Sequence, residues 1–192
     1  MALVALFHSA LGVTPGIDDA AARLRTGGHE VHVVDYYGGR VFDDYDPAVA
    51  HVDEVGFPAL MAAALDGVSD LPDGFVPAGF SNGAGLAQYV AGQRRVSGAV
   101  MLSGAIDPAY LETTWPPGVP AQIHTTVDDP WRDEGIEAAA AAVEAAGATV
   151  EVFDYPGSGH LFADPSRADE YQPEEAELMW SRVLAFLERV AP

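Results

Sequence analysis

A serine framed by glycines is the strongest candidate for chemistry in this chain. Residues 79–83 read Gly-Phe-Ser-Asn-Gly, with Ser81 at the centre, and Ala84 and Gly85 follow. A Gly-x-Ser-x-Gly pattern is typical of a sharp turn between a strand and a helix, which holds a serine hydroxyl clear of the sheet in strained backbone geometry. An apolar run precedes the pattern, and the amphipathic run 86–90 follows it. We therefore predict that Ser81 is a nucleophile for acyl transfer.

A serine nucleophile on such a turn needs a carboxylate and a histidine, which follow it along the chain in that order. Asp128 and Asp129 stand at the end of a predicted strand at 120–127, and His160 lies in a glycine-flanked loop after the last predicted strand. His160 would take the Ser81 proton and later return it to the leaving group. A carboxylate would hold the imidazole in the required tautomer. The spacing leaves both aspartates open as the acid.

These residues also have purely structural interpretations. Serine and aspartate are frequent in turns, and a loop histidine is often satisfied by a backbone carbonyl. The strand–turn–helix setting of Ser81 and the place of His160 after the last strand favour catalysis. His8 and His124 are in the wrong chain order for the base, and we interpret them as strand-end residues. The remaining histidines are interpreted as surface or packing residues: His29, His32 and His51.

The same glycines also resemble the phosphate-binding turn of short-chain dehydrogenases, where a pyrophosphate sits at a helix N-terminus. That turn follows the first strand of its domain, whereas at least two predicted strands precede Ser81. Those enzymes also use a Tyr-x-x-x-Lys pair, and this chain has no lysine, so all nine basic residues are arginine. The absence of lysine likewise excludes a P-loop lysine and a Schiff-base lysine. We expect no cofactor.

Composition narrows the function further. The chain has 192 residues, no cysteine, and six histidines without the spacing of metal ligands, so we expect neither disulfides nor a metal centre. The net charge of −20 argues against nucleic acid and anionic membranes as partners. The chain shows no basic leader and no apolar segment of about 18 residues, so a cytoplasmic protein is expected. A monomer and a homodimer both remain open.

Strands and helices alternate along the chain, which predicts a mostly parallel sheet of about six strands with helices on both faces, a three-layer αβα sandwich. The predicted strands lie near 2–8, 29–35, 75–80, 97–103, 120–127 and 148–155, and the predicted helices near 16–27, 52–67, 83–94, 133–147 and 173–190. Pro58 is expected to begin or kink the second helix. With no linker visible, residues 1–192 are expected to form a single domain.

Over nearly its whole length the chain resembles the dienelactone hydrolase family, a compact branch of the α/β-hydrolases without a lid domain. The segments that carry the resemblance are LFHSALG at 6–12, DYYGGR at 35–40, the turn at 79–83, DPW at 129–131 and GSGHLF at 157–162. The resemblance implies an α/β-hydrolase fold, with Asp129 as the acid beside Ser81 and His160. It also implies an oxyanion hole made of the backbone N–H groups of Ala10 and Asn82.

Three positions differ from the name-giving enzymes of that family. Those enzymes use cysteine at the turn, a glutamate at the position of Ser9, and a carboxylate-binding arginine at the position of Asp164. Because Asp164 would repel an anionic substrate, we expect a neutral carboxylic ester, thioester or lactone instead of dienelactone. Its cleavage would pass through an acyl-enzyme on Ser81.

Four aromatic residues are candidates to line the substrate pocket, since ligand sites are mostly apolar with few polar groups. They are Tyr36, Phe80, Trp131 and Phe162. Packing in the core is the alternative for each of them. The alternative function is a hydrolase fold that binds a small ligand without turning it over, because a fold alone does not guarantee activity.

Overall fold

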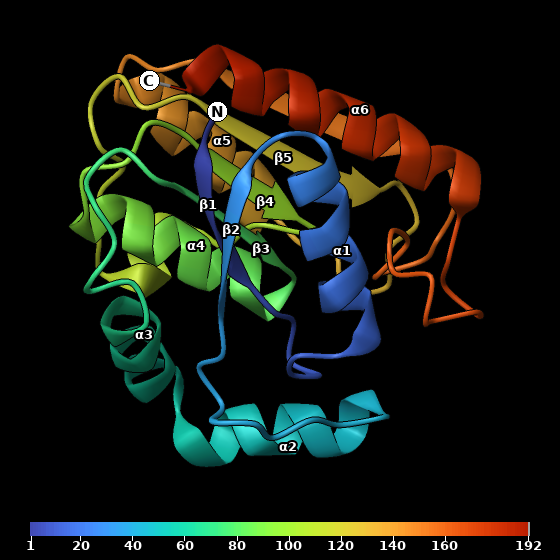
Figure 1. Ribbon diagram of the computed structural model, residues 1–192. Coiled ribbons are helices and arrows are strands. Elements are labelled where there is room, and N and C mark those ends of the chain that lie inside the picture. The colour runs from blue at the N-terminus through green and yellow to red at the C-terminus, as the bar shows by residue number, and fades with distance from the viewer. Residues whose placement is uncertain (192) are drawn as a thin grey trace.

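The computed structural model describes residues 1–191 and contains one six-stranded sheet between two layers of helices (Figure 1). The strands are β1 (Leu3–Phe7), β2 (Glu30–Val34), β3 (Val76–Phe80), β4 (Ala99–Leu102), β5 (Ala121–Thr126) and β6 (Val150–Tyr155). The helices are α1 (Pro15–Thr26), α2 (Tyr45–Val55), α3 (Phe57–Asp66), α4 (Asn82–Gln93), the short 3₁₀ helix η1 (Pro108–Leu111), α5 (Gly135–Ala145) and α6 (Pro173–Val190). The strand order is β2-β1-β3-β4-β5-β6, and all neighbouring pairs are parallel. The predicted three-layer α/β fold is confirmed.

Each face of the sheet is buried under helices. Val4 and Leu6 of β1 pack with α1 and α6, whereas Ala5 and Phe7 of the same strand pack with α3 and α4. A further cluster joins α4 and α5 to β4 and β5. Because both faces are covered, β3 and β4 are buried at every position and have no polar face, as parallel strands require.

The helix predicted at 52–67 is wrong in its bounds. The chain forms two helices there, α2 and α3, which meet at an angle of 87°. Gly56 separates them with a φ of 79°, which favours glycine, and Pro58 lies in the first turn of α3, where a missing N–H costs no intrahelical hydrogen bond. Pro58 therefore helps to begin α3. The bend lets α2 cross near the carboxyl ends of the strands (Figure 1).

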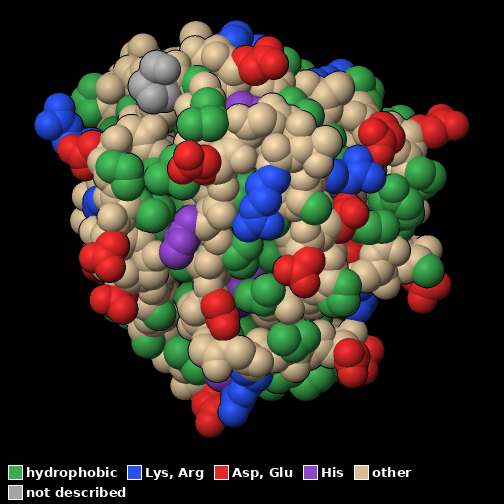
Figure 2. All heavy atoms as spheres, in the orientation of Figure 1, with side chains coloured by type: hydrophobic (Ala, Val, Ile, Leu, Met, Phe, Trp, Pro, Cys, Tyr) green, Lys and Arg blue, Asp and Glu red, His purple; other side chains and the backbone are tan. Residues whose placement is uncertain are grey.

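Charged side chains are scattered over the face of the molecule that Figure 2 shows. Figure 2 shows carboxylates scattered over one face, with arginines interspersed, as the net charge of −20 suggests. On this face the charged side chains form no single large patch, so together they give a diffuse negative potential. Among residues 1–191 no single helix is long and apolar enough to cross a membrane, and α2 and α3 pass that test only as a sharply bent pair.

Two fully buried histidines make the stability of the fold depend on pH. His124 of β5 donates from Nε2 to Gln122 and accepts at Nδ1 from the Tyr155 hydroxyl, at 3.1 and 2.8 Å. Burial lowers the pKa of His124 to about 3 and that of His8 to about 4. Both rings are therefore neutral in the fold at neutral pH. In the unfolded chain the same rings take up a proton below a pH of about 6.5.

Because the unfolded state binds more protons, the contribution of His124 to the free energy of unfolding is complete above a pH of about 6.5 and declines toward a pH of about 3. We expect the His124 contribution to be about 2 kcal/mol smaller at pH 5 than at pH 7. Urea denaturation of wild type and His124→Gln at both pH values measures it. The variant should lose less stability on acidification, and an equal loss in both proteins would contradict the assignment.

Candidate active site

Ser81 occupies a strained turn between the end of β3 and the start of α4. Its φ of 53° and ψ of −117° lie where residues with a side chain are rarely found. The two motif glycines allow this turn. A Cβ on Gly79 would lie 2.1 Å from the carbonyl oxygen of Gly83, and a Cβ on Gly83 would lie 2.2 Å from the carbonyl oxygen of His8. Both glycines are therefore required for β3, α4 and the loop after β1 to close around the serine.

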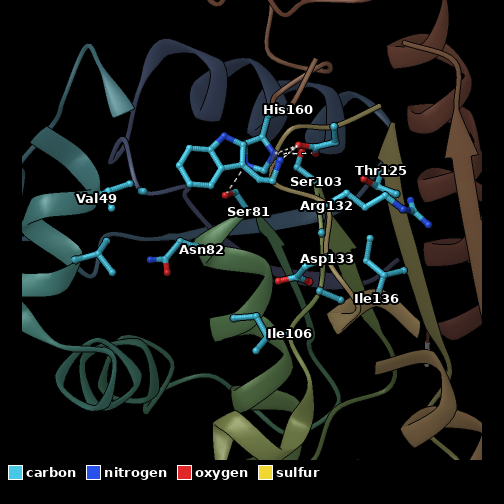
Figure 3. A pocket seen from close by; sticks show the side chains of 16 residues that line it. Val49, Ser81, Asn82, Ser103, Ile106, Thr125, Arg132, Asp133, Ile136 and His160 are labelled. Atoms are coloured by element: carbon cyan, nitrogen blue, oxygen red, sulfur yellow. Dashed lines mark hydrogen bonds and ion pairs between the residues drawn. The ribbon is translucent and has the colours of Figure 1, made fainter. Parts of the chain in front are cut away.

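The structure joins Ser81, His160 and Asp129 by hydrogen bonds in series. His160 Nε2 lies 2.7 Å from Ser81 Oγ, and His160 Nδ1 lies 2.8 Å from Asp129 Oδ2 and 3.0 Å from Oδ1. Figure 3 shows His160 over Ser81, with the dashed line between them. Since a carboxylate only accepts, the proton belongs on Nδ1, which leaves Nε2 free to accept from the Ser81 hydroxyl. Neutral His160 in this tautomer can deprotonate the serine.

The geometry distinguishes between the two candidate acids. The Asp129 side chain is 2% exposed, and its Oδ1 also accepts a hydrogen bond of 2.8 Å from the backbone N–H of Trp131. Asp128 is exposed, and its backbone N–H donates to the carbonyl of Gly157 at 3.0 Å. Only Asp129 is therefore placed to orient His160.

The loop that carries His160 is held by a carboxylate that the sequence did not reveal. Glu170 Oε2 accepts a hydrogen bond of 2.8 Å from the backbone N–H of Leu161, the residue after His160. The hydroxyl of Tyr45, at the start of α2, donates to the same carboxylate at 2.9 and 3.0 Å. Glu170 thus ties the histidine loop to α2. No motif or periodicity marks a glutamate ten residues beyond a histidine, so the sequence had no signal for this contact.

The two predicted oxyanion donors lie beside the serine. Ala10 follows β1, Asn82 is the first residue of α4, and both line the same cavity as Ser81. Within residues 1–191 neither of these backbone N–H groups has a protein acceptor. Free N–H groups are normal at a helix N-terminus, where the helix dipole also favours negative charge. An oxygen that gains charge beside Ser81 would find both donors unoccupied.

A cavity of about 250 Å³ opens beside the serine. Figure 3 shows Val49 and Asn82 to one side of Ser81, and Arg132, Asp133 and Ile136 to the other. The lining residues are Ala10, Val49, Val52, Ser81, Asn82, Ser103, Gly104, Ala105, Ile106, Thr125, Asp129, Trp131, Arg132, Asp133, Ile136 and His160. Most of this surface is apolar, and the volume suits a small substrate. Among residues 1–191 no group of three or more His, Asp or Glu side chains is arranged to hold a metal ion.

Of the four aromatic residues predicted to line the pocket, only Trp131 does so, and it is 52% exposed at the cavity. The other three are buried elsewhere. Phe80 packs on Trp180 of α6 with ring centroids 6.2 Å apart, and Phe162 packs on Tyr155 at 5.1 Å. Tyr36 stacks on His8 behind the loop after β1. The physical reason is that these side chains fill the helix–sheet interface, where apolar burial stabilises the fold.

Asp164 does not face the cavity, which corrects the argument made from its charge. Its carboxylate lies against the start of α1, where a Cβ on Gly16 would be 2.1 Å from Asp164 Cγ. There Oδ1 accepts hydrogen bonds from the backbone N–H and hydroxyl of Ser166 at 2.8 and 2.6 Å. A carboxylate at a helix N-terminus is favoured by the dipole. Asp164 therefore has a structural role at the start of α1 and does not line the cavity beside Ser81.

Among the lining residues of the cavity, the charged side chains do not favour an anionic group. Arg132 is the one cationic side chain among the lining residues. Its guanidinium donates to Asp154 at 2.6 Å and to Glu137 at 3.3 Å, so two carboxylates already balance it. An anionic group in the cavity would also lie near Asp133. Repulsion from that carboxylate opposes an anionic ligand.

Comparison with known proteins identifies the family of this chain. The model of the dienelactone hydrolase family matches residues 2–191. A dienelactone hydrolase-like promiscuous phosphotriesterase from metagenomic libraries superposes with a TM-score of 0.79 and 17% identity, over 99% of this chain and 87% of its own. A putative dienelactone hydrolase from Klebsiella pneumoniae gives 0.75 and 21% identity, over 95% and 85%. An esterase from Pyrobaculum calidifontis gives 0.73 and 21%, over 100% and 77%. No protein with a curated description matches. The chain belongs to the dienelactone hydrolase family and is a hydrolase that acts on esters.

Proposed function

We propose that this protein is a serine hydrolase that cleaves a small neutral carboxylic ester, thioester or lactone through an acyl-enzyme on Ser81. The observation that carries the proposal is the unbroken hydrogen-bond series from Ser81 through His160 to Asp129 at the edge of a small, mostly apolar cavity. Solved structures of similar fold include proteins named as esterases, which is consistent with this chemistry.

In the first half of the reaction, His160 Nε2 takes the Ser81 proton while Oγ attacks the ester carbonyl. The carbonyl oxygen becomes an oxyanion, which accepts hydrogen bonds from the N–H groups of Ala10 and Asn82. Asp129 stabilises the imidazolium that forms, without taking its proton. His160 then protonates the departing alcohol or thiol, and Ser81 remains acylated.

In the second half, a water molecule takes the place of the leaving group. His160 accepts a proton from this water as it attacks the acyl carbonyl, and the same two N–H groups bind the second oxyanion. Collapse of the intermediate breaks the bond to Ser81 Oγ, which recovers its proton from His160. The products are the free acid and the regenerated enzyme, so no cofactor takes part in the scheme.

Labelling with a fluorophosphonate, followed by mass spectrometry, tests the proposal. We expect one adduct on wild-type protein, mapped to Ser81, because the probe reacts only with an activated serine. His160→Ala should slow the labelling by about 100-fold or more, since the general base is lost. His32→Ala is the matched control, because His32 is exposed on the edge strand β2, contacts the carbonyl of Gly67 and does not line the cavity.

The alternative is a protein of this fold that binds a small ligand without hydrolysing it. Folded wild-type protein that forms no adduct, or an adduct on another serine, would overturn the proposed mechanism. If Ser81 is labelled equally fast in His160→Ala, Ser81 remains the proposed nucleophile, but His160 is not its general base.

A further inference from the structure

The hydroxyl of Tyr36 lies between the two segments that carry the proposed oxyanion donors. It donates to the carbonyl oxygen of His8 at 2.7 Å, with a longer contact of 3.3 Å to the carbonyl of Ser9. It also accepts a hydrogen bond of 3.3 Å from the side-chain amide of Asn82. One segment is the loop that leads from His8 to Ala10, and the other is the start of α4. A single buried hydroxyl therefore links both sides of the oxyanion site.

The neighbouring groups hold this hydroxyl and the loop in one arrangement. The rings of Tyr36 and His8 are stacked, with centroids 3.7 Å apart and an interplanar angle of 14°. His8 Nδ1–H donates to the carbonyl oxygen of Ser9 at 2.6 Å. Because burial lowers the pKa of His8 to about 4, the ring stays neutral at pH 7 and this bond keeps its direction. Two carbonyls before Ala10 are thus each fixed by a side chain.

The carbonyl oxygen of His8 is also in direct contact with the turn that carries Ser81. A Cβ on Gly83 would lie only 2.2 Å from the His8 oxygen, so the backbone of α4 and that of the loop touch at this point. Movement of the His8 carbonyl shifts Ala10 relative to the first turn of α4. The Tyr36 hydroxyl donates a hydrogen bond to this same carbonyl oxygen.

Resting on the proposed function, we propose that Tyr36 is a positioning residue for the oxyanion hole, whose hydroxyl sets the separation of the Ala10 and Asn82 N–H groups. It does so through the His8 carbonyl on one side and the Asn82 side chain on the other. Tyr36 does not touch the substrate, because it lies outside the cavity lining. Oxyanion donors act on the charge that develops in the transition state, so their displacement lowers kcat with little effect on substrate binding.

The test compares Tyr36→Phe with Tyr37→Phe on a neutral p-nitrophenyl ester. The first variant keeps the stacked ring and removes only the hydroxyl. Tyr37 is a matched control, because its ring packs on the same His8 and Tyr36 rings while its buried hydroxyl has no partner among residues 1–191. We expect Tyr36→Phe to lower kcat about 10- to 100-fold with KM within about threefold, since loss of a whole donor costs about 100- to 1,000-fold. Tyr37→Phe should stay within about twofold of wild type.

A second measurement separates a positioning effect from a general structural one. A trifluoromethyl ketone forms a hemiketal with an active serine, and its oxyanion binds the same donors. Its affinity should fall in Tyr36→Phe by the same factor as kcat/KM, as expected for an analogue of the transition state. Equal kinetics and equal affinity in the two phenylalanine variants would overturn the inference, as would a Tyr36→Phe effect confined to KM.

Asn82→Ala provides a readout if Tyr36→Phe does not fold. It removes the side-chain donor to Tyr36 at a partly exposed position and leaves the backbone N–H of residue 82 in place. We expect Asn82→Ala to bind the ketone more weakly than wild type. Where both single variants fold, the double variant Tyr36→Phe/Asn82→Ala should bind the ketone no more weakly than Tyr36→Phe alone. Wild-type ketone affinity in Asn82→Ala, or additive losses, would contradict the link. Failure of the proposed function is distinct, since wild-type protein would then show no hydrolysis that depends on Ser81.

Discussion

Ser81→Ala is expected to lower kcat/KM for a small neutral ester by about 10⁴- to 10⁶-fold, the largest effect of any single substitution in this protein. The variant removes the hydroxyl oxygen that lies 2.7 Å from His160 Nε2. Without that oxygen no acyl-enzyme forms, and hydrolysis falls back on water activated by the histidine together with the oxyanion donors. Steady-state hydrolysis of a p-nitrophenyl ester by protein free of wild-type contamination measures the loss.

Ser181→Ala is the control for this experiment. Ser181 lies on α6, is exposed, and donates to the carbonyl of Leu178, so its loss should leave kcat/KM within about twofold of wild type. Ser81→Ala should also keep its stability, because the alanine removes one oxygen at the cavity without leaving a void in the core. Activity above about one per cent of wild type in Ser81→Ala would show that another group is the nucleophile.

The second large effect is expected from Asp129→Asn, with a loss of about 10⁴-fold in kcat near neutral pH. The amide keeps the shape of the carboxylate but brings an NH₂ donor toward His160 Nδ1. The ring then adopts the tautomer that carries its proton on Nε2, which can no longer accept from Ser81. The negative charge that stabilises the imidazolium is lost as well.

Asp128→Asn is a matched control, because it makes the same chemical change one residue away at an exposed position. We expect its kcat to stay within about threefold of wild type. Comparing kcat in these two variants tests which aspartate orients His160. Comparable losses in both variants would mean that general negative charge near His160 matters more than the bond to Asp129, and a larger loss in Asp128→Asn would exchange their roles.

Much of the fold followed from local patterns. The alternation of apolar runs and helical stretches placed all six strands of the sheet. The central strands β3 and β4 are apolar throughout, because they are buried on both faces. The missed break between α2 and α3 shows where this reasoning stops. Residues 52–67 read as one helix apart from Pro58, and a proline in the first turn of a helix is as acceptable as one at a kink. The break occurs at Gly56, whose φ of 79° ends α2 and separates it from α3.

The candidate nucleophile Ser81 and the candidate base His160 could be found from the sequence because each lies in a segment with local constraints. Gly79 and Gly83 mark the turn at Ser81, because a Cβ at either position would clash with neighbouring backbone. The chain order of serine, acid and histidine follows from the order of the strands. The spacing left Asp128 and Asp129 both open and the resemblance favoured Asp129, and the tertiary structure places the Asp129 carboxylate 2.8 Å from His160 Nδ1. Adjacent residues after a strand point in different directions, and which of them meets His160 depends on how two distant loops pack.

The roles of side chains that follow no local rule were also left to the tertiary structure. By itself the sequence determined the class of chemistry, since glycine spacing and residue type constrain backbone and reactivity locally. It did not determine that Asp164 turns toward α1, that Glu170 holds the loop of His160, or that Tyr36 lies behind the loop after β1 and not in the cavity. Each of these depends on partners far along the chain. Burial and hydrogen-bond satisfaction, which only the folded arrangement supplies, decide where such side chains go.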